Sequence, residues 1–161
     1  MNKLIIIRGN SGSGKTTLAK LLHDKYKNNS ILISQDVIRR QMLDGDDNKT
    51  IEVISNLLDF TSKNYDIAIL EGIFVKRKYE RLFNNIRGIY KLEQIQAYYY
   101  DLSFEETVKR HSMRDCKEEF DDKKMRSWFV EKDYLDDFNE IKFDENISIN
   151  EAISTIEFNT K

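Results

Sequence analysis

The sequence predicts an α/β domain in which a mainly parallel sheet of five strands lies between two layers of helices. First, short apolar segments alternate with stretches of helical periodicity, at about residues 3–8, 30–34, 66–70, 94–100 and 139–143. Second, a glycine-rich segment separates the first apolar segment from the first helix. Third, a chain of 161 residues, 40% hydrophobic and 34% charged, is typical of one globular domain over residues 1–161.

The glycine-rich segment, GNSGSGKTT, has the G-x-x-x-x-G-K-[ST] spacing of a phosphate-binding loop. Residues 4–7 before it are typical of a buried strand, and Leu18, Leu21 and Leu22 after it follow helical spacing. This strand–loop–helix context favours a true motif over a chance match. We therefore expect nucleotide phosphates to be bound by the loop residues Gly9, Asn10, Ser11, Gly12, Ser13, Gly14, Lys15, Thr16 and Thr17.

Each residue type in this loop has a physical role. Glycines allow the backbone to turn its N–H groups toward phosphate oxygens, and the helix that begins near Lys15 directs its positive dipole end toward them. Lys15 is expected to reach the β- and γ-phosphates, and the Thr16 hydroxyl to bind Mg²⁺. Thr17 is assigned to the α-phosphate side.

The second strand, residues 30–34, ends directly before Asp36. Ligands of open α/β sheets bind outside the carboxyl ends of the strands, so Asp36 and Arg39 lie at the appropriate end of the sheet. They are three residues apart in a helical segment and can face one point. A role for Asp36 as a helix cap alone is the alternative, and we favour a catalytic or substrate-binding role.

The third strand ends at Glu71, where a phosphate-loop protein places a carboxylate near its metal ion. We expect Glu71 to hold Mg²⁺ through water or to bind a substrate hydroxyl. The alternative is an exposed glutamate before the turn at Gly72. A helix is predicted over residues 75–87, and the basic residues 76–78 at its start are interpreted as a solvated face.

Residues 92–100 predict a strand covered on both faces, because three consecutive tyrosines end it. Ser103 then begins a helix that runs to about Met113 and carries Arg110, with Arg114 just beyond it. The two arginines are four apart on one face, where two guanidinium groups can meet one phosphate chain. A highly charged segment follows before helical spacing resumes over residues 125–135. We interpret residues 112–124 as a lid, with a solvated helix–helix connection as the alternative of equal weight.

Composition excludes several classes of protein. A net charge of −2 with interspersed signs gives no footprint for nucleic acid, so we do not expect a nucleic-acid partner. Cys116 is the single cysteine, which rules out an internal disulfide and suits a reducing compartment. No apolar segment is long enough to span a membrane, and no leader is evident. The expected location is the cytoplasm.

These motifs resemble those of the P-loop small-molecule kinases, most closely the branch that contains zeta toxins and chloramphenicol phosphotransferases. This group also includes AAA-type ATP-binding and uridine-kinase-like proteins. The resemblance is carried by residues 9–17 (GNSGSGKTT), 35–40 (QDVIRR), 70–72 (LEG), 101–114 (DLSFEETVKRHSMR) and 125–129 (MRSWF). The chain is much shorter than the zeta toxins, so the resemblance does not extend to their sugar-nucleotide substrate.

The resemblance implies a P-loop NTPase fold with strand order 2-3-1-4-5, a helical lid, ATP with Mg²⁺, and transfer of the γ-phosphoryl group to a hydroxyl. It implies that Lys15 is catalytic and that Asp36 is the general base. Arg39 would help to bind substrate, and Glu71 would lie near substrate or metal. Arg110 and Arg114 would be the catalytic lid arginines.

The sequence leaves the phosphoryl acceptor open among nucleosides, antibiotics and sugar-like molecules, since residues 37–65 and 73–90 would form its pocket. Two other functions remain. One is an ATP-binding regulatory switch with slow ATPase activity. The other is a polynucleotide 5′-hydroxyl kinase, against which the near-neutral charge argues. The choice of ATP over GTP rests on the resemblance, because no N-K-x-D segment is present. Oligomeric state is not specified.

Overall fold

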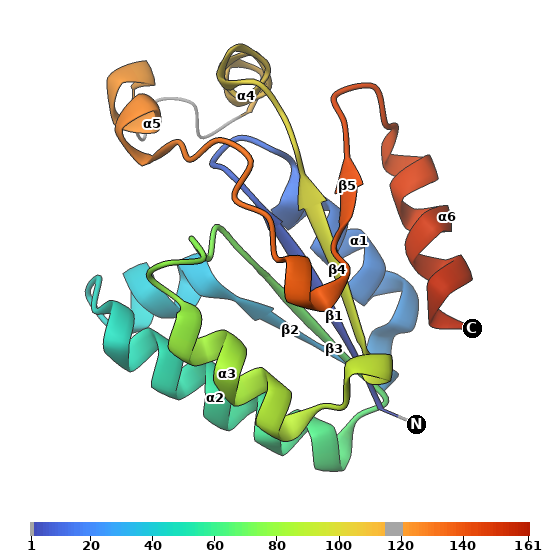
Figure 1. Ribbon diagram of the computed structural model, residues 1–161. Helices are drawn as coiled ribbons and strands as arrows, with labels where there is room; N and C mark the ends of the chain where they lie inside the picture. Colours follow the sequence, from blue (N-terminus) through green and yellow to red (C-terminus); the bar gives the residue numbers. More distant parts are fainter. Residues whose placement is uncertain (1, 115–120) are drawn as a thin grey trace.

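The computed structural model describes residues 2–114 and 121–161 and shows a five-stranded sheet between two helical layers (Figure 1). All strand pairs are parallel, and the strand order β2-β3-β1-β4-β5 confirms the predicted order. The strands are β1 (Lys3–Gly9), β2 (Ser30–Ser34), β3 (Ile67–Gly72), β4 (Ile95–Tyr100) and β5 (Ile141–Phe143).

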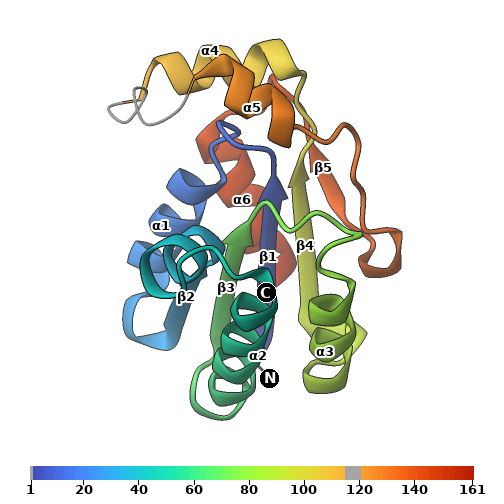
Figure 2. The same cartoon turned by 90° about the vertical axis from the view of Figure 1, so that its left-hand side faces the viewer.

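Helices cover both faces of the sheet and its carboxyl end. Helices α2 and α3 lie on one face, α1 and α6 on the other, and α4 and α5 lie across the carboxyl ends of the strands (Figures 1 and 2). The helices are α1 (Lys15–Tyr26), α2 (Asp47–Asn64), α3 (Glu80–Ile89), α4 (Phe104–Ser112), α5 (Asp122–Trp128) and α6 (Ile149–Thr160). Shorter turns are a π-helix, Val37–Met42, and 3₁₀-helices Lys27–Asn29, Leu92–Gln94 and Asp136–Phe138.

Strand β1 is buried on both sides, which explains its nearly continuous apolar run. Leu4 and Ile6 face the core under α2 and α3, whereas Ile5 and Ile7 face the core under α1 and α6. The tyrosines 98–100 that end β4 are all buried, as predicted. Within residues 2–114 and 121–161, no helix combines the length and hydropathy needed to cross a membrane.

The helix predicted over residues 75–87 begins only at Glu80. Long-range contacts hold the preceding segment in a turn. The Asp133 carboxylate accepts a hydrogen bond from the Lys76 backbone N–H at 2.8 Å, and the Phe74 carbonyl accepts from the Arg8 guanidinium at 3.0 Å. Asp133 and Arg8 lie far away in the sequence, yet they bond to the backbone of this segment.

The helical pattern predicted over residues 125–135 also ends early, at Trp128. Val130 pairs both its backbone N–H and its carbonyl with the Asn10 side chain, at 2.9 and 2.8 Å. This pairing satisfies the groups that a longer helix would have used. At the start of α6, Ser148 and Glu151 form a complete capping box. Ser103 caps α4 alone, because the Glu106 carboxylate turns to Arg110 at 2.9 Å.

Arg8, the one charged residue within the buried part of β1, has a fully buried side chain. Its guanidinium lies 2.7 Å from the Asp133 carboxylate and 3.0 Å from the Glu140 carboxylate, and it also donates to the Phe74 carbonyl. It lies over the ring of Tyr99 at 5.3 Å. The sequence analysis missed this network, although a charge at the end of an apolar strand was the available signal.

We predict that Arg8→Met lowers the free energy of unfolding by about 3–5 kcal/mol, because it leaves buried carboxylates without a counter-ion. Urea denaturation followed by circular dichroism measures the change. Arg87→Met is the matched control, since Arg87 pairs with Asp137 at the surface at 2.6 Å and its loss should cost about 0–1 kcal/mol. Equal losses in the two variants would contradict the prediction.

The same variant should show an altered pH dependence. Burial raises the pKa of Glu140 above its ordinary value of 4.5, and Arg8 opposes that rise. The folded state therefore binds a proton more readily than the unfolded state, so stability from this group grows as pH falls. Removing Arg8 raises the pKa of Glu140 further. The stability lost by Arg8→Met should consequently be smaller at pH 5 than at pH 7.

Candidate active site

The predicted site lies at the carboxyl end of the sheet, over which α4 and α5 lie (Figure 2). Strand β1 leads into the phosphate loop, β2 into Asp36, and β3 ends with Glu71 and Gly72. The Gln35 side chain fastens two of these strand ends together, because its Oε1 accepts a hydrogen bond from the Ile73 N–H at 2.7 Å.

The phosphate loop requires glycine at two positions with left-handed backbone. Gly12 has φ +81° and Gly14 has φ +98°. A Cβ on Gly12 would lie 2.6 Å from the Thr107 carbonyl oxygen, so the loop and α4 approach each other closely. Gly14 caps α1 without a side-chain hydrogen bond. The N–H groups of the first turn of α1 are therefore available to an anion.

Lys15 is a buried cation at the centre of this site. Its Nζ donates to the Asn10 carbonyl at 3.2 Å. Burial lowers the pKa of Lys15, the negative charges of Glu71 and Asp36 raise it, and the positive charge of Arg114 lowers it. Three charges from three other segments thus act on Lys15. A phosphate group at this point would restore the compensation that the buried ammonium has lost to desolvation.

Glu71 is only 1% exposed and accepts hydrogen bonds from two hydroxyls. Thr16 Oγ1 donates to one carboxylate oxygen at 3.2 Å, and Ser34 Oγ donates to the other at 2.5 Å. Hydroxyl and carboxylate oxygens are the ligands that Mg²⁺ prefers, so this group of side chains fits the expected ion. The sequence analysis missed Ser34, although it is a hydroxyl residue at the end of β2.

Asp36 lies open to solvent, with a side chain 65% exposed, and pairs with Arg40 at 3.5 Å. Arg39 instead binds Asp47 at 2.7 Å, and the Tyr79 hydroxyl donates to the same carboxylate oxygen at 2.6 Å. The segment after Asp36 is a π-helix, whose wider turn does not bring residues three apart onto one line. Asp36 and Arg39 therefore have separate partners.

Arg110 is bound at the edge of the phosphate loop. Its guanidinium donates to the Ser13 carbonyl at 2.9 Å, to Glu106 at 2.9 Å and to the Glu145 carbonyl at 3.3 Å. Arg114 is exposed at the end of α4, and its charge acts on Lys15. The central part of the predicted lid, residues 115–120, lies outside the described residues.

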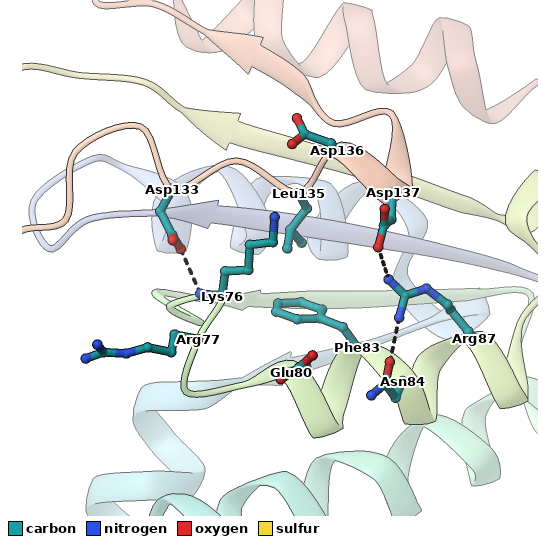
Figure 3. A pocket seen from close by; sticks show the side chains of 10 residues that line it. All are labelled: Lys76, Arg77, Glu80, Phe83, Asn84, Arg87, Asp133, Leu135, Asp136 and Asp137. Carbon is teal, nitrogen blue, oxygen red and sulfur yellow. Dashed lines mark hydrogen bonds and ion pairs between the residues drawn. The ribbon is translucent and has the colours of Figure 1, made fainter.

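A pocket of about 400 Å³ lies between α3 and the segment at residues 133–137 (Figure 3). Its α3 side comes from the predicted segment 73–90, whereas its other wall was not predicted, and no residue of 37–65 lines it. Lys76 and Arg77 are offset by Glu80 and Asp136, so the pocket carries mixed charge. The lining residues are Lys76, Arg77, Glu80, Phe83, Asn84, Arg87, Asp133, Leu135, Asp136 and Asp137.

A phosphate loop at the carboxyl end of a 2-3-1-4-5 parallel sheet, with a carboxylate on the neighbouring strand, defines the class of ATP-binding P-loop kinases. Comparisons with known proteins point to the same class. The family described as the AAA domain matches residues 4–77, which contain the phosphate loop, Asp36 and Glu71. A probable thymidylate kinase from Methanococcus aeolicus is 31% identical over 186 residues, covering 98% of this chain and 91% of the relative. The chain belongs to the family of P-loop kinases that includes this relative, and it is a kinase.

Solved structures share the whole fold. A gluconokinase from Sinorhizobium meliloti 1021 has a TM-score of 0.73 and 15% identity, covering 98% of this chain and 91% of that chain. A putative kinase from Chloroflexus aurantiacus has a TM-score of 0.67 and 19% identity, covering 98% of both chains. The tunicamycin resistance protein of Deinococcus radiodurans has a TM-score of 0.67 and 13% identity, covering 98% and 94%. At these identities the likeness shows the fold.

We predict that Lys15→Ala weakens ATP binding by about tenfold or more, because it removes the buried cation that faces the phosphates. Isothermal titration calorimetry with ATP measures the change. Lys20→Ala, an exposed lysine on the same helix, is the control and should bind ATP as the unaltered protein does. Unchanged affinity in Lys15→Ala would exclude this loop as the nucleotide site.

Proposed function

We propose that the protein transfers the γ-phosphoryl group of ATP, with Mg²⁺, to a hydroxyl of a small molecule such as a nucleoside, an antibiotic or a sugar-like compound. The observation that carries the proposal is the convergence of Lys15, Glu71 and Asp36, three charges from three strand ends, around the phosphate loop. Phosphoryl transfer depends mainly on positioning and charge stabilisation, and this arrangement supplies both.

The proposed role of each residue follows from its position in the site. The loop backbone and Lys15 would hold the phosphates, while Thr16 and Glu71, the latter through water, would hold Mg²⁺. When bound, Mg²⁺ neutralises charge on the transferring phosphates. Asp36, open to solvent beside this point, would accept the proton of the acceptor hydroxyl. Arg114 would bring positive charge to the transferring group.

Two further arginines have supporting positions in this proposal. Arg110 would clamp the nucleotide from the edge of the loop, where the Ser13 carbonyl and Glu106 already fix its guanidinium. Arg39 would contact the acceptor from beside the Asp47 carboxylate. The predicted single domain with a lid at residues 112–124 is part of the same proposal, because a closing lid excludes water from the transfer.

The names of related proteins support a small acceptor but differ in its identity. They include a gluconokinase, a thymidylate kinase and a tunicamycin resistance protein. The pocket beside α3 has the volume of a small-molecule site. We consider it a candidate for the body of the acceptor, with Lys76 and Arg77 in its lining.

Two alternative functions remain testable. A regulatory switch with slow ATPase activity would bind ATP without a small-molecule acceptor. The second alternative is a polynucleotide 5′-hydroxyl kinase. A chain of the Pnkp1/Rnl/Hen1 RNA repair complex shares the fold with a TM-score of 0.56, and the match covers 45% of that chain. The net charge of −2 weighs against that function, since binding to phosphate backbones depends on lysine and arginine.

We predict that Asp36→Asn lowers kcat by about 10²–10⁴-fold while ATP affinity stays unchanged, because the amide cannot accept the hydroxyl proton. Steady-state kinetics and calorimetry on the same preparation measure the two quantities. Asp44→Asn, an exposed carboxylate in the loop after the π-helix, is the matched control. Normal turnover by Asp36→Asn would show that the general base lies elsewhere.

The acceptor itself is found by measuring ADP release from ATP and Mg²⁺ across a panel of nucleosides, sugars, gluconate, tunicamycin and thymidylate, with Lys15→Ala as the blank. We expect one class to raise the rate and to gain the mass of a phosphoryl group. ADP release that no small molecule stimulates would favour the switch. Transfer to oligonucleotides that weakens steeply with salt would favour the polynucleotide kinase.

A further inference from the structure

Helices α4 and α5 both contact the phosphate loop. On the α4 side, Arg110 donates to the Ser13 carbonyl at 2.9 Å, and Gly12 lies against the Thr107 carbonyl. On the α5 side, the Met125 side chain lies near the same glycine, where a Cβ would meet its methyl group at 3.1 Å. These contacts join the phosphate loop to both α4 and α5.

A further contact fixes the segment that returns from α5 to the sheet. The Asn10 side-chain amide donates to the Val130 carbonyl at 2.8 Å and accepts from the Val130 N–H at 2.9 Å, although the residues are 120 apart in the sequence. Asn10 is 6% exposed, so these bonds are partly buried. An amide that satisfies both backbone groups of one residue determines where that residue lies.

Asn10 also touches the cation that faces the phosphates. Its backbone carbonyl accepts from Lys15 Nζ at 3.2 Å, while its side chain is committed to Val130. A phosphate that draws Lys15 or the loop N–H groups therefore acts on the residue that holds the end of α5. Asn10 therefore links the two: its backbone carbonyl bonds to Lys15 of the phosphate loop, and its side chain bonds to Val130, just beyond α5.

We propose that Asn10 is a positioning residue whose side chain couples occupancy of the phosphate loop to the arrangement of α5. The effect on catalysis rests on the proposed function, whereas the effect on the lid requires only that ATP binds. Without the side chain, nucleotide binding to the loop would no longer be transmitted to Val130. Helix α5 would then sample other arrangements in the presence of bound ATP.

A tryptophan at the end of α5 can report the position of that helix. Trp128 is the single tryptophan, lies at the end of α5 two residues before Val130, and is 45% exposed. Its fluorescence can be titrated with a non-hydrolysable ATP analogue and Mg²⁺. We expect the emission of the unaltered protein to change at saturation. In Asn10→Ala the analogue should bind within about threefold of normal, with the emission change reduced by more than half and kcat lowered about tenfold or more.

Controls separate coupling from a loss of structure. Asn64→Ala removes an exposed asparagine whose side chain donates to the Phe60 carbonyl within α2, and it should retain the full emission change. Thermal unfolding of each variant checks that the fold persists. Val130→Pro removes the N–H from the other partner, and the extended Phe129 backbone (φ −66°, ψ 126°) suits a residue that precedes proline. Combined with Asn10→Ala, it should add little further effect, since both changes break one contact.

The outcomes are distinct. A full emission change and normal kcat in Asn10→Ala would overturn the proposal, as would an unaltered protein whose emission ignores saturating analogue. Strictly additive effects of Asn10→Ala and Val130→Pro would also overturn it. If no acceptor is found but Asn10→Ala still loses the emission change, the coupling stands while the proposed phosphoryl transfer fails.

Discussion

The positive charge of Arg8 must be neutralised inside the sheet, and the segments that neutralise it are those that surround the site. Asp133 and Glu140 come from the chain after α5, and Phe74 from the loop after β3. Because an unpaired buried charge is strongly destabilising, these segments have little freedom to move independently. One arginine thus holds the C-terminal part of the chain and the loop before α3 against the base of the phosphate loop.

Above that base, the site combines a firm centre with an open side. Glu71 is buried and held by the hydroxyls of Thr16 and Ser34, so its oxygens are positioned before any ligand arrives. Lys15 is likewise buried, and burial lowers its pKa. Asp36, in contrast, is exposed at the end of β2. Groups held in place suit the binding of a nucleotide, and an accessible carboxylate suits an acceptor that enters from solvent.

Much of this architecture was predictable from local sequence, for physical reasons. Buried parallel strands need continuous apolar segments, and β1 and β3 appear where such segments occur. The phosphate loop needs glycine at left-handed positions followed by Lys15, so its pattern is readable without a structure. The two serine caps, Ser103 and Ser148, were readable because a cap bonds only to its own first helical turn.

The sequence by itself determined the strands, the phosphate loop and the class of chemistry, since each depends on residues close together in the chain. The tertiary structure alone decided where α3 begins, where α5 ends and which partner Arg39 takes. The start of α3 depends on Asp133 and the end of α5 on the Asn10 side chain, which bond to backbone groups far away in the sequence, whereas Arg39 binds Asp47. A local pattern carries no record of such partners, because only the folded chain brings them together.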